Sequence, residues 1–205
     1  GAMLAVMAER GAVERALGGL PGVVLANDNH PTQVVLSGTT PGIVAAQQQL
    51  SAAGFKTSRL DVSHAFHSPL MAGVDSGLKP ALHALSLHPP DTQVVSCITA
   101  RPYESVAEAR EVWARHATQP VRFVEALRAC VETAGVTHFV QVGGGTTLLS
   151  FARAVAPGEG PRTNRQLFEE RTRYGSCPMC HTSLNGPVQQ LAPCWFGYYS
   201  AVERL

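Results

Sequence analysis

The sequence predicts an α/β fold, and three observations support that prediction. Short β-branched runs alternate with Ala- and Leu-rich segments of helical spacing along the first three quarters of the chain. Apolar residues make up 45% of the 205 residues, enough to bury a sizeable core at this length. The 19 glycines and 14 prolines are only slightly above the usual share. A collagen-like, coiled-coil or wholly disordered chain is therefore excluded.

Residues 1–63 are expected to form a first unit with the order β-α-β-β-α-β. The expected strands are 3–7, 23–26, 33–36 and 57–62, and the expected helices are 13–17 and 42–53. Between the second and third strands, residues 27–31 are a cluster of turn formers. Thr40 is expected to cap the second helix, with Pro41 at its first position. This order is the split βαβ arrangement of a ferredoxin-like sandwich.

Residues 64–156 are expected to form a second unit in which helices and strands alternate, a pattern that favours a parallel sheet. The expected elements are helix 70–87, strand 93–98, helices 105–117 and 119–133, strand 137–142 and helix 146–156. In the third of these, acidic residues come early and Arg115 and His116 come late, which suits the helix dipole. Residues 157–205 show no clear period and form a Cys-containing tail without predicted structure.

Charge and cysteine content narrow the class of protein. The chain has 16 basic and 15 acidic residues and no block of like charges, so no nucleic-acid partner is expected. No membrane association is expected either, because no run of eighteen apolar residues and no export signal occur. Five cysteines at irregular spacing favour a reduced, cytoplasmic protein over a disulfide framework. Residue 1 is Gly, so we expect a segment of a longer protein or a processed end.

The most informative stretch for chemistry is residues 61–71, at the end of a predicted strand and just before a long helix. His64 and His67 lie three residues apart in the loop, where scaffolds commonly present catalytic side chains. A histidine there can serve as general base for a hydroxyl nucleophile. The competing interpretation of the spacing is that one histidine caps the helix and the other is simply exposed.

The order of residues in this stretch is distinctive. His-Ala-Phe-His-Ser-Pro at 64–69 resembles the signature of acyltransferase domains, the malonyl-CoA:acyl carrier protein transacylase family, most closely those of modular polyketide synthases. Segments 1–6, 27–38, 119–123 and 142–149 are similar to further family segments in the same order. The resemblance covers residues 1 to 156. It implies a ferredoxin-like small subdomain and the C-terminal part of an α/β-hydrolase-like subdomain, with the active site between them.

The resemblance also implies roles for four residues. His67 would be the general base for a serine nucleophile, and the backbone carbonyl of Gln119 would orient its imidazole. His64 and Phe66 stand at positions associated with the choice of acyl group. A bulky Phe66 narrows the pocket, which implies a preference for malonyl over methylmalonyl.

The family's nucleophile is missing from the sequence. No Gly-x-Ser-x-Gly occurs in the 205 residues, and in the family the arginine that binds the malonyl carboxylate also belongs upstream. We therefore expect the chain to be inactive alone. The implied partners are malonyl-CoA, an acyl carrier protein and the missing upstream acyltransferase segment or other polyketide synthase domains. The alternative is a non-catalytic, truncated acyltransferase that acts as a binding module.

Two further motifs leave alternatives open. Residues 143–145 are three glycines, which either form the family's last turn or cradle a phosphate, although the rest of a P-loop is absent. Cys177, Cys180 and Cys194, with His181, suit a zinc site, in which case the chain would be a zinc-knuckle protein fused to an inactive fragment. Cys177, Cys180 and His181 also match a haem attachment motif, and the remaining interpretation is that the cysteines are free thiols. No cofactor is otherwise expected.

Overall fold

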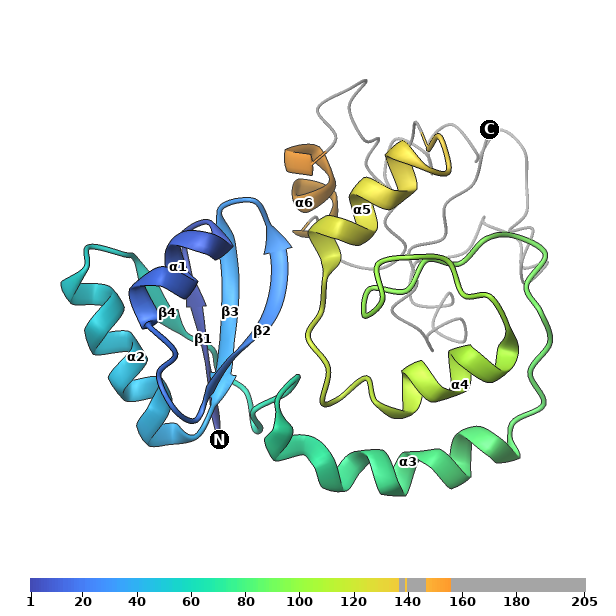
Figure 1. Ribbon diagram of the computed structural model, residues 1–205, viewed down its shortest axis with the longest axis horizontal. Helices are drawn as coiled ribbons and strands as arrows, with labels where there is room; N and C mark the ends of the chain where they lie inside the picture. Colours follow the sequence, from blue (N-terminus) through green and yellow to red (C-terminus); the bar gives the residue numbers. More distant parts are fainter. Residues whose placement is uncertain (137–138, 140–146, 156–205) are drawn as a thin grey trace, which may run out of the picture.

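The computed structural model describes residues 1–136, 139 and 147–155, which form a small sheet unit followed by a group of helices (Figure 1). The elements are β1 (Ala2–Val6), α1 (Arg10–Leu17), β2 (Val23–His30), β3 (Gln33–Gly38), α2 (Thr40–Ala52), β4 (Thr57–Arg59), the 3₁₀ turn η1 (Pro69–Met71), α3 (Ala72–Ala84), α4 (Val106–Ala114), α5 (Phe123–Glu132) and α6 (Thr147–Val155).

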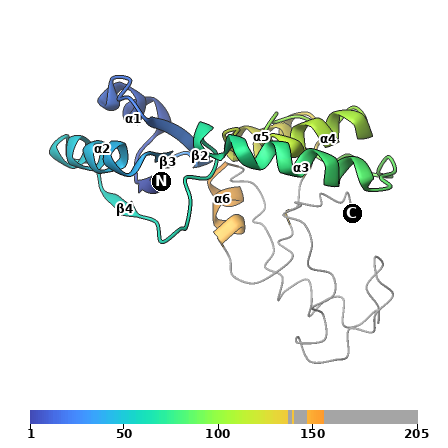
Figure 2. The same cartoon turned by 90° about the horizontal axis from the view of Figure 1, so that it is seen from below.

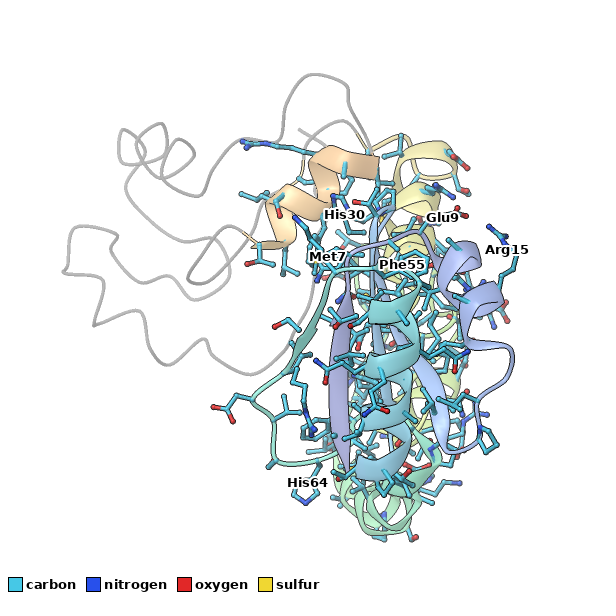
Figure 3. The ribbon with its side chains drawn as sticks, turned by 90° about the vertical axis from the view of Figure 1, so that its left-hand side faces the viewer. Met7, Glu9, Arg15, His30, Phe55 and His64 are labelled. Carbon is cyan, nitrogen blue, oxygen red and sulfur yellow. The ribbon has the colours of Figure 1, made fainter. Side chains whose placement is uncertain are left out.

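The four strands form one sheet in the order β2-β3-β1-β4, and all neighbours are antiparallel. Along the chain the elements follow the order β-α-β-β-α-β that the sequence pattern predicts. Alternate residues of β1 and β3 face α1 and α2, which together bury a core at this face. Its fully buried side chains include Leu4, Leu36, Ile43 and Leu50. In Figure 3, where α2 and the strands run lengthwise up the picture, His64 lies at the opposite end of the unit from Met7 and His30.

Several boundaries in this unit differ from the sequence prediction, and three of the differences have a clear physical reason. The turn formers at 27–30 belong to β2, because Asn27 and Asp28 pair with β3 across bulges and the chain reverses only after His30. The N-cap of α2 is Thr39 and not Thr40, since Thr39 Oγ1 accepts a hydrogen bond from the Gly42 N–H at 3.1 Å. β4 is shorter than expected, since its pairing with β1 ends at Arg59.

The strand expected at 93–98 is absent. Val95 makes one isolated bridge to Pro102, and the chain then turns because Ser96 Oγ accepts the N–H groups of Ile98 and Thr99. The described residues therefore contain no parallel sheet, and the four-stranded antiparallel sheet is their one sheet. Two predicted features lie outside the described residues, the glycines at 143–145 and the tail at 157–205. Of the strand expected at 137–142, only residue 139 is described.

The helices of the second unit differ in how much they bury. α5 and α6 pack together through Leu127, Phe151 and Ala152. By contrast, α3 lies along α4 (Figure 2) and has no buried residue of its own. Val74 remains exposed on it. Within the part of the chain that the structure describes, no helix has the length and apolar character needed to cross a bilayer.

Candidate active site

His67 lies in the loop between β4 and η1, and its backbone adopts the left-handed conformation with φ of 58°. This conformation is uncommon for a residue with a Cβ and costs of order 1–3 kcal/mol, so the surroundings must hold it. The backbone N–H of His67 donates to the carbonyl oxygen of Ala117 at 2.8 Å. The histidine is thus attached to a segment about fifty residues further along the chain.

The imidazole is held by the same segment. His67 Nδ1 lies 3.0 Å from the carbonyl oxygen of Gln119 and 3.0 Å from that of His116. Because carbonyl oxygens only accept, the proton is placed on Nδ1, and Nε2 is left as the acceptor. Nε2 has no hydrogen-bond partner among the described residues. The geometry therefore presents an imidazole that can take up a proton at Nε2.

The segment that bears these carbonyls is anchored to the small sheet. The Val121 N–H donates to Ala26 O at 2.8 Å, and the Asp28 N–H donates to Val121 O at 2.8 Å, as in a parallel bridge. This pairing needs β2 to remain extended through Asp28, at the positions that the sequence indicates as a turn. The edge of the sheet therefore fixes Gln119 from one side.

Burial controls the electrostatics of the site. His67 is half-buried, and loss of hydration lowers its pKa, while the hydrogen bonds to the Gln119 and His116 carbonyls act in the opposite direction. The His116 ring meets the His67 ring edge-on, with centroids 5.4 Å apart. The pKa of His116 is also lowered, first by burial and then by the charge of His67. Burial therefore favours the neutral imidazole at both His67 and His116 near neutral pH.

The other two predicted residues form a separate pair. His64 and Phe66 are exposed, and their rings lie 6.0 Å apart in a tilted arrangement. His64 Nδ1 is 2.9 Å from Ser63 Oγ, a contact between chain neighbours on an open loop. His64 Nε2 has no hydrogen-bond partner among the described residues, so nothing there orients this histidine as a third group orients a catalytic base.

Ser68, next to His67, and the two cysteines of the described residues are not free nucleophiles. Ser68 is buried, and its hydroxyl donates to the Ala65 carbonyl at 2.6 Å. Burial raises the pKa of the Cys97 thiol to about 11, and burial also raises that of Cys130. Neither thiol is ionised at neutral pH, so neither replaces a serine nucleophile.

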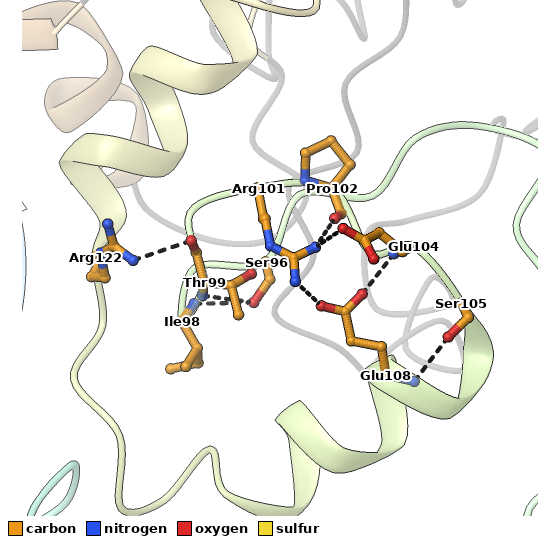
Figure 4. A network of polar contacts seen from close by, with 9 residues as sticks. All are labelled: Ser96, Ile98, Thr99, Arg101, Pro102, Glu104, Ser105, Glu108 and Arg122. Carbon is orange, nitrogen blue, oxygen red and sulfur yellow. Dashed lines mark hydrogen bonds and ion pairs between the residues drawn. The ribbon is translucent and has the colours of Figure 1, made fainter.

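A polar network lies beside the site (Figure 4). Arg101 pairs with Glu104 and Glu108, and Arg122 pairs with Glu125 and donates to Thr99 O. A hollow of about 380 Å³ next to this network is lined by Arg101, Arg115 and Arg122, among others, and by Gln119. The guanidinium groups of Arg101 and Arg122 are engaged with carboxylates, and through these contacts the network braces the 96–108 segment.

Sequence reasoning missed two contributors to the site. His116, interpreted as a residue of the helix end, supplies a carbonyl and a ring contact to His67. Val121 ties the carbonyl segment to β2. Only the neighbouring Gln119-Pro120 signal pointed to this segment.

No group of three or more His, Cys, Asp or Glu side chains in the described residues is arranged to hold a metal ion. The zinc ligands expected at Cys177, Cys180 and Cys194 lie outside the described residues, and that interpretation stays a prediction.

Comparison with known proteins gives a consistent family. Residues 1–152 match the family model described as acyl transferase domain. The chain is 34% identical over 203 residues to polyketide synthase GfsA of Streptomyces halstedii, covering 98% of the chain and 3% of GfsA. It is 38% identical over 155 residues to the spectinabilin polyketide synthase system protein NorB of Streptomyces orinoci, covering 75% of the chain and 7% of NorB.

Solved structures agree. The acyltransferase domain from the second module of the salinomycin polyketide synthase superposes with a TM-score of 0.71 at 30% identity, covering 83% of this chain and 42% of that one. The malonyl-CoA:acyl carrier protein transacylase FabD of Xanthomonas oryzae superposes with a TM-score of 0.74 at 29% identity. The match covers 79% of this chain and 53% of that one. The chain thus spans about half of these solved chains and a small fraction of the polyketide synthases.

Proposed function

This chain belongs to the acyl transferase family, and from that membership we propose that it is a polyketide synthase segment that supplies the general base for malonyl transfer. The observation that supports this most directly is the His67 imidazole, with Nδ1 facing the carbonyls of Gln119 and His116 and Nε2 left as acceptor. This resembles the histidine and its orienting acceptor in a catalytic triad, with carbonyl oxygens in place of the carboxylate. Gln119 acts in it through its backbone.

The proposed transfer has two steps. In the first, Nε2 of His67 takes the proton of a serine hydroxyl, the serine oxygen attacks the malonyl thioester carbon, and the coenzyme A thiol leaves with the proton. In the second, the thiol of an acyl carrier protein gives its proton to His67 and attacks the serine ester, and the serine leaves with that proton. The transfer uses no metal or cofactor.

The serine must come from outside this sequence, which has no Gly-x-Ser-x-Gly. We therefore propose that the chain forms no acyl-enzyme alone and that its partners are an upstream acyltransferase segment, malonyl-CoA and an acyl carrier protein. In this proposal the sheet unit is the ferredoxin-like subdomain, and the helices from η1 onward belong to an α/β-hydrolase-like subdomain. The β2-β3-β1-β4 order supports the first assignment.

We further propose that Phe66 and His64 shape the acyl pocket and favour malonyl over methylmalonyl. Phe66 is exposed in this chain, with its ring near that of His64, so it is available to line a pocket completed by another segment. Replacing Phe66 by Ala is expected to raise the relative use of methylmalonyl-CoA by roughly tenfold, the range in which one methyl group is discriminated.

The test is complementation. The chain is mixed with a segment of a related acyltransferase that carries Gly-His-Ser-x-Gly, and transfer of radiolabelled malonyl to a carrier protein is measured. We expect no label on the chain alone, label on the serine of the added segment, and a loss of about 10²–10⁴-fold in rate for His67→Gln. His88→Gln, at an exposed histidine, is the matched control.

Two results would contradict the proposal. A covalent malonyl label on the chain alone would mean that it contains a nucleophile, and Ser63→Ala would then test the hydroxyl beside His64. Carrier-protein binding without any transfer in the complemented mixture, equally in wild type and His67→Gln, would favour the non-catalytic binding module.

A further inference from the structure

The carbonyls that face His67 lie on a turn, residues 115–119, which is fixed from the opposite side by one side-chain hydrogen bond. Thr118 Oγ1 donates to Asp75 Oδ2 at 2.9 Å. Asp75 lies in the first turn of α3, which follows directly on η1 and His67. We propose that Asp75, acting through Thr118, is a positioning residue that sets the tautomer of His67.

The contacts form a closed ring. From His67 the chain runs through η1 into α3 and reaches Asp75, eight residues later. Asp75 binds Thr118, and the residues on either side of Thr118 return to His67: the Ala117 carbonyl accepts from its backbone N–H, and the Gln119 carbonyl faces its Nδ1. The Thr118 N–H and the Gln119 N–H both donate to Arg115 O at 3.1 Å, so the turn moves as one body. A shift of Thr118 therefore shifts the carbonyls that hold the imidazole.

The chemistry of the pair supports a directed contact. Thr118 Oγ1 also lies 3.0 Å from Arg115 O, but its single proton is drawn to the charged carboxylate, which is the stronger acceptor. The second carboxylate oxygen, Asp75 Oδ1, is buried and has no hydrogen-bond partner among the described residues. Such a group costs free energy in the folded chain, while the position of Asp75 in the first turn of α3 suits the helix dipole. Holding the turn is the role that its one contact provides.

This inference rests on the proposed role of His67, because the tautomer matters for a base that must accept at Nε2. With both carbonyls in place, the proton stays on Nδ1; when they move away, the two nitrogens compete for it. The titratable group that faces His67 from the carbonyl turn is His116, which the variants below leave unsubstituted. The effect can therefore be read at His67 without any acyl transfer.

The experiment is a ¹⁵N NMR measurement of the histidine tautomers in the whole chain at neutral pH. Thr118→Val removes the hydroxyl at constant shape, and Asp75→Asn weakens the acceptor. We expect both to lower the ratio of Nδ1–H to Nε2–H tautomer at His67, Thr118→Val by roughly fivefold, as for the loss of one ordinary hydrogen bond. Thr118→Ser keeps the hydroxyl and should restore the wild-type ratio, and Asp61→Asn, an exposed aspartate in the same loop, should leave it unchanged.

An unchanged tautomer ratio in folded Thr118→Val and Asp75→Asn would overturn the proposal, as would a Thr118→Ser variant that behaves like Thr118→Val. If Thr118→Val fails to fold, Asp75→Asn together with Thr118→Ser decides the question. A wild-type His67 that carries its proton on Nε2 would instead contradict the proposed general base, so the two failures are distinguishable.

Discussion

The sheet unit and the helical unit reach their structures by different means. In the sheet unit, α1 and α2 cover one face of four paired strands, and the core at that face is closed within sixty residues. In the helical unit, α3 buries none of its residues and packs mainly on α4. The first unit therefore closes the core at that face from its own sequence, whereas α3 packs on α4 and buries none of its residues.

The candidate site lies where the two units meet, and it depends on the better packed one. His67 is joined to Ala117, and Val121 is paired with β2, so the sheet edge acts as the frame for the carbonyl segment. A strained histidine backbone needs such a frame, because its conformation costs free energy that local contacts must offset. The comparison teaches that the segment which holds the base is fixed by the sheet edge at Val121 and by α3 at Thr118.

The largest expected difference between the units concerns apolar side chains. Leu36→Ala removes a side chain that is 1% exposed and should lower the free energy of unfolding by about 2–5 kcal/mol. Leu85→Ala, at the end of α3, removes a side chain that is 51% exposed. It should change the free energy of unfolding by less than about 0.5 kcal/mol. Urea denaturation of the two variants measures both. Equal effects would mean that α3 is as well packed as the sheet.

Replacing glycine by alanine should have opposite effects on stability in the two units. A Cβ on Gly38 would lie 2.0 Å from the carbonyl oxygen of Gly22, a backbone atom that cannot move aside cheaply, so Gly38→Ala should destabilise by about 1–3 kcal/mol. A Cβ on Gly73 in α3 meets nothing within 4 Å, and Gly73→Ala should stabilise by about 0.5–1 kcal/mol through helix propensity. Thermal unfolding followed by circular dichroism tests both, and a stabilising Gly38→Ala would contradict the strand geometry.

A smaller effect tests which threonine begins α2. Thr39→Ala should cost about 1 kcal/mol, since it removes the oxygen that accepts the Gly42 N–H. Thr40→Ala, at an exposed neighbour, should cost at most about 0.5 kcal/mol. Chemical denaturation of the pair gives the comparison. The reverse order would restore the cap expected from the sequence.

The difference between the two units also explains which of their helices and strands could be predicted from the sequence. In the sheet unit, strand and helix order follows from local alternation and spacing, and the predicted order β-α-β-β-α-β agrees with the structure. The extension of β2 through residues 27–30 could not be predicted, because Asn and Asp favour turns locally and the strand there is held by partners on β3 and at Val121. Non-local pairing overrode the local preference.

In the helical unit, a β-branched run at 93–98 predicted a strand, but it pairs at one position only. An extended strand needs a longer neighbour, and among the described residues the partner that it bridges to is the 101–103 segment that follows the turn. For the site, the resemblance of residues 64–69 and 119–123 to acyltransferase signatures led to His67 and Gln119, and the family is confirmed by the match over residues 1–152. Thr118 and Asp75 could not be predicted, since their contact joins positions 43 residues apart without a motif.

The last prediction concerns pH and brings the two units together. Burial lowers the pKa of both His67 and His116 in the folded chain below the ordinary value of 6.5. As the pH falls below 6.5, the unfolded chain binds these protons first, so the free energy of unfolding should decrease, whereas above 6.5 both states are neutral at these residues. Urea midpoints at about pH 7.5 and about pH 5 should therefore differ less in the double variant His67→Gln, His116→Gln than in wild type, while His88→Gln keeps the wild-type difference. An identical pH dependence in the double variant would mean that the pair is as well hydrated as in the unfolded chain. The sheet edge would then fail to shield the base that it positions.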